Sequence, residues 1–424
     1  HEVILLTIGV LGIVQGRDGA AGDAVQGLIN SGQGEPGRAI VLAGEAVADA
    51  YPGGVTPACQ QVVVQELLKT LRNDKVVKPV LRAHAGRTLA RLGDPRPEVM
   101  TLEGMEFCYV PPGPFIMGSG DDDPLAYADE KPQHTYAIPY GYWIGRYPVT
   151  NAQFAPFVAA GGYQEPTWWP EALAAGFWRP GEVQDVYYML EDKKLVRHFD
   201  GWRDQPVEFG YPFSILNSPR VGLSWYEALA YTRWLTSVLQ NNKLLPQNLT
   251  ICLPNEPEWE KAGRGGITLP SRSHIQKLTK LSQKALLTNK TRRNTAPTRR
   301  FPWGNSFEVN RLNYKDTKIE TTNTVGAFPC GASLYGANEL CGNFWEWTRS
   351  LWGNDVTSCD FTYPYSTSDR REQLTDGLGM CRVARGGSFN NKARKVRLAA
   401  RLRTFPATRD VALRLVVLPS TFDG

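Results

Sequence analysis

The sequence predicts an α+β fold in which a loop-rich domain of short strands and helices follows a small all-helical region. Three observations carry this prediction. The chain has 424 residues, more than one hydrophobic core usually organises, so two domains are expected. It contains 41 Gly, 30 Pro and 12 Trp, which is typical of a chain that turns often and packs aromatic rings. The pattern also changes near Pro97–Thr101, from helical periodicity to short strands and turns.

Residues 1–98 have the pattern of short helices joined by Gly- and Pro-rich turns. Residues 39–48 and 62–71 carry apolar side chains on one stripe. Residues 80–92 end as a helix should, with Gly93 after the last periodic residue and a proline beyond. This pattern predicts either stacked helical repeats or a small helical cap packed on the next domain.

Composition and charge exclude several classes of protein. Hydrophobic residues make up 42% and charged residues 21% of the chain, as in globular proteins. The longest apolar run, Val3–Val14, is too short to cross a bilayer, so no membrane partner is expected. Seven cysteines without a CxxC pair argue against a zinc ribbon and a disulfide scaffold and favour a reducing compartment, so we expect the cytoplasm. Because the chain opens at His1, we expect it to be part of a longer intracellular protein.

A basic segment interrupts the second domain at residues 267–300. It has nine Lys and Arg residues and no acid, and it contains no aromatic residue. The pattern indicates a solvated insertion loop. The alternative is a patch that binds nucleic acid or an acidic partner, but such patches usually interleave aromatic residues with the charges, and the net charge of +5 is mild. Nucleic acid is therefore not the expected partner.

Two segments of the second domain begin with helix-capping residues. Thr150 precedes an amphipathic stretch that ends at Val158. Ser224 and Glu227 have the spacing of a capping box, at the start of a second amphipathic stretch that runs through Leu235.

Seven sequence blocks occur in order between Met105 and Val417. They are Met117–Ser119, Tyr142–Phe154, Val221–Ala228, Leu253–Ala262, Phe301–Asn305, Gly342–Trp347 and Arg385–Phe389. In this order and spacing they resemble the formylglycine-generating-enzyme, or sulfatase-modifying factor, family. The resemblance implies that family's variant of the C-type lectin fold over residues 103–418.

The resemblance does not extend to the residues that carry the family's oxidase chemistry. The oxidase members have two cysteines shortly after the Gly-Gly-Ser block, which bind copper and act as thiolates. No cysteine follows Cys381 here, so copper is not expected. The ergothioneine-type sulfoxide synthases bind iron through histidines, and the five histidines of this chain are widely spaced, so iron is not expected either. We therefore predict a domain without catalysis. The alternative is a formylglycine-generating or related sulfur-oxidising enzyme with atypical active-site residues.

The resemblance also implies structural calcium. The stretch from Glu339 to Glu346 is similar to a calcium loop of the family, in which these two carboxylates and the backbone carbonyls of Gly342 and Phe344 would be ligands. Asn313 and Asp316 resemble parts of a second site. The alternative is that these side chains only cap turns.

The C-terminal segment from Arg382 to Val417 resembles the variable region of lectin-fold proteins that are diversified by retroelements. In those proteins a fixed frame displays interspersed changeable residues. The resemblance implies that Arg385, Arg397, Arg401 and Arg414 belong to the frame, and we expect them to bond backbone carbonyls in the core. The interleaved residues would contact a protein or peptide ligand. They are Asn390, Asn391, Lys392, Lys395, Leu398, Ala400, Leu402, Thr404, Phe405, Ala407 and Thr408.

The helical region resembles a segment near the carboxyl end of NACHT-type signalling ATPases. Together with the variable-region pattern, this resemblance predicts a receptor or sensor module that binds a ligand.

Overall fold

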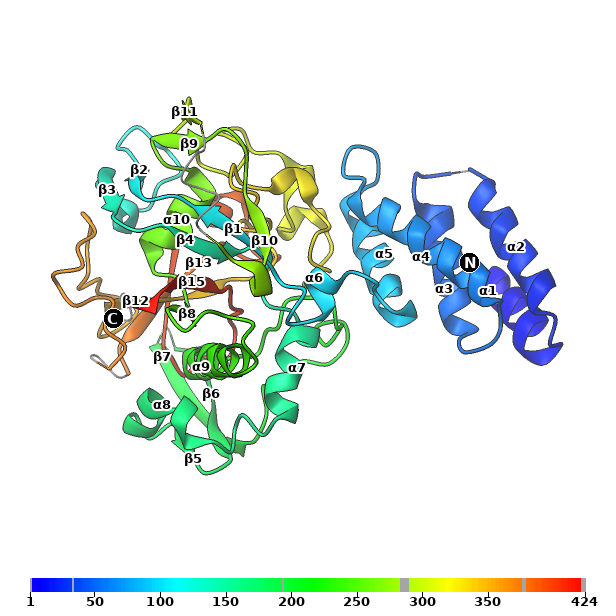
Figure 1. Ribbon diagram of the computed structural model, residues 1–424, viewed down its shortest axis with the longest axis horizontal. Coiled ribbons are helices and arrows are strands. Elements are labelled where there is room, and N and C mark those ends of the chain that lie inside the picture. Colours follow the sequence, from blue (N-terminus) through cyan, green and yellow to red (C-terminus); the bar gives the residue numbers. More distant parts are fainter. Residues whose placement is uncertain (1, 33, 193, 283–289, 376–378, 421–424) are drawn as a thin grey trace.

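The computed structural model describes residues 2–32, 34–192, 194–282, 290–375 and 379–420. Its first hundred residues are helical, and the first strand begins at Glu106. Figure 1 shows these helices at one end of the molecule and the strands at the other. The helices are α1 (Glu2–Gly9), the π-helix η1 (Val10–Val14), α2 (Asp18–Asn30), α3 (Arg38–Asp49), α4 (Pro57–Arg72), α5 (Pro79–Leu92) and α6 (Pro97–Met100).

The helices at residues 39–48, 62–71 and 80–92 are confirmed, as α3, α4 and α5. Helix α4 begins where the side chain of Thr56 accepts a hydrogen bond from the backbone N–H of Cys59. Helix α5 ends at Gly93, whose φ of 90° favours glycine. In the described part of the chain, no helix combines the length and the apolarity that a membrane span requires.

The second part is built around a five-stranded sheet with the order β10-β1-β4-β15-β8, in which every pair is antiparallel. Successive residues face opposite sides of this sheet. Ile144 and Val416 lie in one hydrophobic cluster, while Trp143 and Val417 lie in another. The sheet therefore separates two cores. Its strands are β1 (Glu106–Val110), β4 (Tyr142–Gly145), β8 (Leu249–Cys252), β10 (Ile275–Lys277) and β15 (Val416–Pro419).

Smaller sheets and four helices surround this sheet. Capping boxes begin α7 at Thr150, α9 at Ser224 and α10 at Asn255. The first two were predicted, although α9 extends beyond Leu235 to Asn241. The helices are α7 (Asn151–Ala159), α8 (Pro170–Ala174), α9 (Trp225–Asn241) and α10 (Glu256–Arg264). The strands are β2 (Gly113–Met117), β3 (His134–Ile138), β5 (Trp178–Arg179), β6 (Glu182–Glu191), β7 (Lys194–Arg203), β9 (Thr268–Pro270), β11 (Thr291–Arg293), β12 (Glu346–Gly353), β13 (Cys381–Arg385) and β14 (Arg401–Thr404).

The basic segment at residues 267–300 is more structured than the predicted solvated loop. Strand β10 pairs with β1 in the main sheet, and β9 pairs with β11. Three leucines hold this segment to the domain, because Leu269, Leu278 and Leu281 are buried. The prediction weighed the charges and overlooked these apolar anchors. Residues 283–289 lie outside the described residues.

Buried polar contacts join the helical region to the second part. The side-chain amide of Asn217 donates to the carbonyl of Gly86 at 3.0 Å and to Asp94 Oδ2 at 2.8 Å. Its Oδ1 accepts from the hydroxyl of Thr324 at 2.8 Å. Arg96 donates to the carbonyl of Val325 at 2.8 Å. Because these groups are buried, separating the two parts would leave several polar groups without partners.

We expect Gly86→Ala to destabilise the protein. A Cβ at Gly86 would lie 2.5 Å from Thr324 Cβ, so α5 and the loop that carries Thr324 would have to move apart. A loss of about 1–3 kcal/mol is expected by denaturant unfolding. Gly27→Ala in α2 is the matched control, because a Cβ there meets nothing within 4 Å, and it should be neutral or stabilise by up to about 1 kcal/mol. Equal stability of the two variants would contradict this account of the interface.

Candidate ligand-binding site

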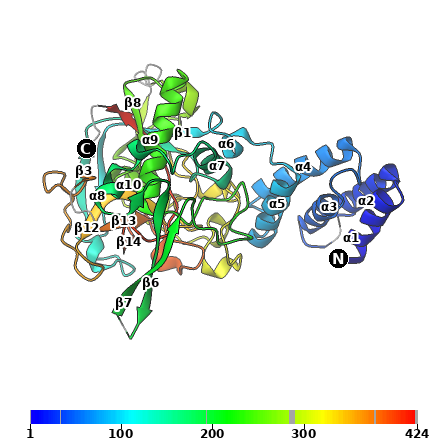
Figure 2. The ribbon, with the colours of Figure 1, turned by 90° about the horizontal axis from the view of Figure 1, so that it is seen from below.

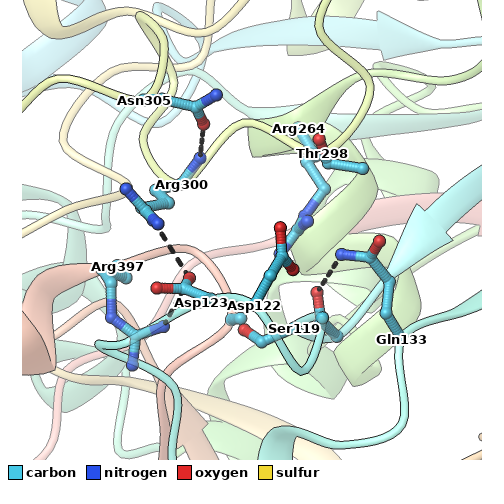
Figure 3. Close-up of a pocket in the computed structure, with 12 residues that line it drawn as sticks. Ser119, Asp122, Asp123, Gln133, Arg264, Thr298, Arg300, Asn305 and Arg397 are labelled. Atoms are coloured by element: carbon cyan, nitrogen blue, oxygen red, sulfur yellow. Dashed lines mark hydrogen bonds and ion pairs between the residues drawn. The ribbon is translucent and has the colours of Figure 1, made fainter.

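A polar cavity of about 320 Å³ opens beside the C-terminal segment (Figure 3). Four segments contribute to its wall: the loop after β2, the end of α10, the turn before residue 305, and the start of the residues that lead into β14. Its lining is rich in hydrogen-bonding side chains. The lining residues are Gly118, Ser119, Gly120, Asp122, Asp123, Gln133, Arg264, Thr298, Arg300, Asn305, Arg397 and Ala399.

The loop after β2 reaches the cavity because it is bonded to α10. Gly118 has a φ of 82°, and its N–H donates to Glu260 Oε1 at 2.9 Å. Ser119 donates to Glu130 Oε2 at 2.7 Å. On the opposite wall, Arg300 Nε donates to Asp123 Oδ2 at 3.0 Å. Burial alone would raise the pKa of Asp123, but the hydrogen bond from Arg300 and the nearby arginine charges hold this pKa below its usual range.

Buried arginines and glutamates pair with one another next to the cavity. Arg397 binds both oxygens of Glu130, at 2.6 and 2.8 Å. Arg401 binds both oxygens of Glu256, each at 2.8 Å. Such fork-like pairs fix the orientation of both side chains. The C-terminal segment is therefore held to α10 and to the loop that precedes β3.

The predicted frame arginines do bond backbone carbonyls. Arg385 donates to the carbonyls of Ala399 and Ala400, and Arg414 to that of Asn338. Their carboxylate partners were not predicted. Arg385 also binds Glu260, and Arg414 binds Glu346. The Asn-Glu-Pro-Glu-Trp-Glu block supplies two of the four partners, Glu256 and Glu260, from a short helix whose residues are all buried.

Eight of the eleven interleaved residues reach solvent, and three do not. The exposed or half-buried ones are Asn390, Asn391, Lys392, Lys395, Leu402, Thr404, Phe405 and Ala407. Leu398, Ala400 and Thr408 are 0%, 1% and 6% exposed, which removes them from the predicted contact set. Leu398 belongs to one hydrophobic core and Ala400 to the other, so these two side chains pack in the interior and do not contact a ligand.

The interleaved residues divide into two groups that contact different elements. Near the cavity, the carbonyl of Asn391 accepts from the backbone of Lys315, and Arg394 donates to the carbonyl of Leu125. Farther along, Phe405 stacks on Tyr188 of β6, with ring centroids 4.5 Å apart. Residues 390–395 therefore precede Arg397 and Ala399 of the cavity wall, and Phe405 lies against the hairpin of β6 and β7.

Sequence reasoning missed the hairpin of β6 and β7. Figure 2 shows it projecting from the body of the domain. Its strands pair over their whole length, with one register shift at Asp185. Met189, Leu195 and Phe199 are 51%, 42% and 49% exposed. The available signal for a strand was the β-branched and aromatic residues Val183, Val186, Tyr187 and Tyr188. The hairpin adds an exposed apolar surface next to Phe405.

The residues that were expected to bind calcium already have other partners. Both oxygens of Glu346 accept from Arg414, and one also accepts from Trp259 Nε1 at 2.7 Å. The side chain of Asn313 bonds Thr317 and the carbonyl of Thr321. Asp316 is exposed on a separate turn.

Glu339 accepts from the N–H of Gly326 and the amide of Asn343, which also bonds the loop at Asn323. The backbone of Gly342 and the segment up to Phe344 lie against Asn313. In this arrangement the predicted set does not fit a calcium ion, because an arginine occupies the principal carboxylate. The oxygens act as acceptors for loops, which is the turn-capping alternative.

The thiols and imidazoles of the described residues offer no assembled redox site. Burial raises the pKa of six of the seven cysteines, including Cys341, whose pKa lies well above its ordinary value, and Cys108, raised to about 12. Thiolate is therefore disfavoured. Both ring nitrogens of His134 have backbone partners. Within the described ranges, no three His, Cys, Asp or Glu side chains gather as metal ligands would.

Comparison with known sequences gives a family and several relatives. A model of the sulfatase-modifying factor enzyme 1-like domain matches residues 94–417. Hercynine oxygenase of Mycolicibacterium smegmatis is 28% identical over 329 residues, which cover 75% of this chain and 62% of that protein. The formylglycine-generating enzyme of Thermomonospora curvata is 27% identical over 322 residues, covering 70% of this chain and 88% of that enzyme. The chain spans 62%, 55% and 44% of three hercynine oxygenases that it matches.

Among solved structures, Treponema denticola variable protein 1 is 17% identical with a TM-score of 0.38, covering 74% of this chain and 94% of that one. That similarity is too weak to carry an argument. The family match supports the fold that the sequence predicted, an α+β domain of the C-type lectin type with a helical region before it.

We expect the stability of the protein to fall as the pH rises from about 4.5 to about 7, because of Glu339. Burial raises the pKa of this carboxyl to about 7, although Asn343, Gly326 and two arginines oppose the rise. The folded state thus favours the protonated acid, and this contribution is lost as the acid ionises. The loss is on the order of 2–3 kcal/mol. Denaturant unfolding across this range should show it.

Glu339→Gln is the control for this titration, because the amide does not ionise. The unfolding free energy of wild type relative to the variant should fall by this amount as the pH rises, because only wild type carries the titrating acid. A difference that stays constant would contradict the raised pKa. Calcium should leave the midpoint of unfolding unchanged at pH 8. A large calcium-dependent increase in this midpoint, abolished by Glu339→Gln, would instead show that calcium binds here.

Proposed function

Because the chain belongs to the sulfatase-modifying factor enzyme 1-like family over residues 94–417, we propose that it is a non-catalytic, ligand-binding member of that family. One observation carries this proposal. In residues 385–408 a buried frame alternates with side chains that reach solvent, in a domain that has no cysteine after Cys381. The scaffold is therefore arranged to display side chains while lacking the thiols that the family's oxidases use.

The displayed surface has the mixture of side chains that protein interfaces favour. The half-buried Leu402 and Phe405 supply apolar and aromatic contact area, and Phe405 stacks on Tyr188 of the hairpin, which also exposes Phe199. In the segment just before Arg397, Lys392 and the neighbouring lysine and asparagines supply charge and hydrogen bonds. This combination supports a protein or peptide ligand.

The module would act as the receptor or sensor part of a larger protein, in the cytoplasm. In this proposal residues 1–98 are a helical segment like that of a NACHT-type signalling ATPase. The buried contacts of Asn217 and Arg96 support it, since they hold the helices firmly to the binding domain. We also propose that the eight exposed interleaved positions are diversified by a retroelement. This part requires a near-copy of the coding region for residues 382–417 beside a reverse transcriptase gene.

The rival function is oxidation of a sulfur compound, because the named relatives include hercynine oxygenases and formylglycine-generating enzymes. In this chain the thiols have raised pKa values, and the described His, Cys, Asp and Glu side chains form no group that would hold a metal ion. These observations favour binding over catalysis.

We expect no oxygen consumption when the protein is supplied with Cu(I) and a cysteine-containing peptide, or with Fe(II) and hercynine plus a thiol. An oxygen electrode measures this directly. The enzyme from Thermomonospora curvata is the positive control for the copper assay. Turnover above the rate of metal and substrate alone would overturn the proposed function.

We expect peptides selected from a random display library to bind the surface around Phe405. Replacing this aromatic anchor by alanine should weaken a selected peptide about tenfold or more. Tyr51→Ala is the matched control, since Tyr51 is an exposed aromatic residue of the helical region, 55% exposed. Surface plasmon resonance gives both affinities. Peptides that bind Phe405→Ala as tightly as wild type would argue against this surface.

A further inference from the structure

Arg264 lies in the wall of the cavity with its guanidinium incompletely bonded (Figure 3). Its side chain is 2% exposed, and its Nη2 is 3.0 Å from Glu260 Oε1. Its Nε has no hydrogen-bond partner within the described residues. Glu260 cannot serve Arg264 alone, because it also accepts from the N–H of Gly118 and binds Arg385. A buried guanidinium with unused donors is costly unless something else bonds it.

The ion pairs around the cavity contain more cations than anions. Five arginines are joined through four carboxylates, so one positive charge is left over. An arginine stays ionised even when buried, so it requires an anion. Of these five arginines, Arg264 is the least well paired, because it shares Glu260 with Arg385 and with the N–H of Gly118. The arginines are Arg264, Arg300, Arg385, Arg397 and Arg401, and the carboxylates are Asp123, Glu130, Glu256 and Glu260.

A second unmatched charge lines the same cavity. Asp122 is exposed, and within the described part of the chain its carboxylate has neither an ion pair nor a hydrogen bond. Its neighbour Asp123 differs, because it is bonded to Arg300 and to the N–H of Leu125. The cavity therefore offers an incompletely bonded guanidinium from α10 and, among the described residues, an unpaired carboxylate from the loop after β2.

We propose that this cavity binds a small zwitterion of the α-amino-acid type, with its carboxylate on Arg264 and its ammonium group on Asp122. The proposal rests on the proposed function, since it names the class of small ligand that a binding member of the family would hold here. A planar guanidinium matches a carboxylate with two parallel hydrogen bonds. A dianion would be repelled by Asp122, and a simple cation would be repelled by Arg264.

The size and the lining of the cavity suit such a ligand. Its volume of about 320 Å³ is at the lower end of small-ligand sites. Thr298 and Asn305 add polar side chains to the wall and would face the side chain of the ligand, and Asn305 lies beside Arg300. Residues 390–395 lie just before Arg397 and Ala399 in the chain, and these two residues line the cavity. A small ligand bound here would alter the surface that the proposed peptide partner meets.

The test is calorimetric titration of the full chain with each standard L-amino acid at millimolar concentration. At least one amino acid should bind wild type. Asp122→Asn should weaken that binding roughly tenfold or more, because the ammonium group loses its charged partner. Asp121→Asn is the matched control: this side chain is 96% exposed, pairs with Lys131 and is not part of the cavity wall, so affinity should not change.

One further variant and a ligand analogue separate the two ends of the ligand. Arg264→Gln should abolish binding of the amino acid, and of its deaminated analogue, which keeps only the carboxylate. Asp122→Asn should spare the analogue. If Arg264→Gln does not fold, wild type is titrated with the decarboxylated amine, which keeps only the ammonium group and should bind roughly tenfold or more weakly than the amino acid.

Absence of binding by every amino acid, or binding that Asp122→Asn leaves unchanged, would overturn the proposal. Either result would leave the proposed function standing, because oxygen consumption and peptide binding are measured separately. Conversely, turnover in the oxygen assay would refute the proposed function whether or not amino acids bind.

Discussion

The second domain depends on buried pairs of arginine and glutamate. Arg385, Arg397, Arg401 and Arg414 all come from the last forty residues, and each binds a carboxylate from an earlier part of the chain. Bringing these charges out of water is unfavourable, and only near-complete pairing compensates for it. Removing one partner would leave an uncompensated buried charge and cost about 3–5 kcal/mol. The C-terminal segment is thus fixed in one register against α10 and its neighbours.

This constraint determines where recognition can take place. The frame arginines are buried, so the side chains of this segment that reach solvent lie between them, in residues 390–395 and in residues 402–407, where Phe405 stacks on the hairpin of β6 and β7. The cavity itself exists because the loop after β2 is bonded to Glu260 and Glu130. The charged residues that stabilise the fold therefore also determine which polar groups line the cavity.

Much of the architecture could be predicted from local signals. The caps at Thr150 and Ser224 and the stop at Gly93 depend only on neighbouring residues, and they define α7, α9 and α5 correctly. The seven blocks indicated the family over nearly the whole matched range. These features need no knowledge of distant partners.

The rest depends on pairings that are remote in sequence. Arg397 and Glu130 are 267 residues apart, and no spacing rule connects them. Burial of Leu398 and Ala400 follows from which core each one meets, whereas the interleaved pattern suggested that they alternate outward. The partner of Glu346 was hidden for the same reason, because Arg414 reaches this carboxylate from 68 residues away. Strand β10 was hidden by the charges around it, since its place in the sheet depends on β1.

The separation between buried frame and displayed side chains has a consequence for how this surface can evolve. Substitutions at exposed positions without shared partners usually have small, additive effects on folding. Changes at Asn390, Lys392 or Lys395 would therefore accumulate almost independently, because these side chains reach solvent while the frame arginines keep their own carboxylates. Such a scaffold could sample many binding specificities without crossing its threshold of stability.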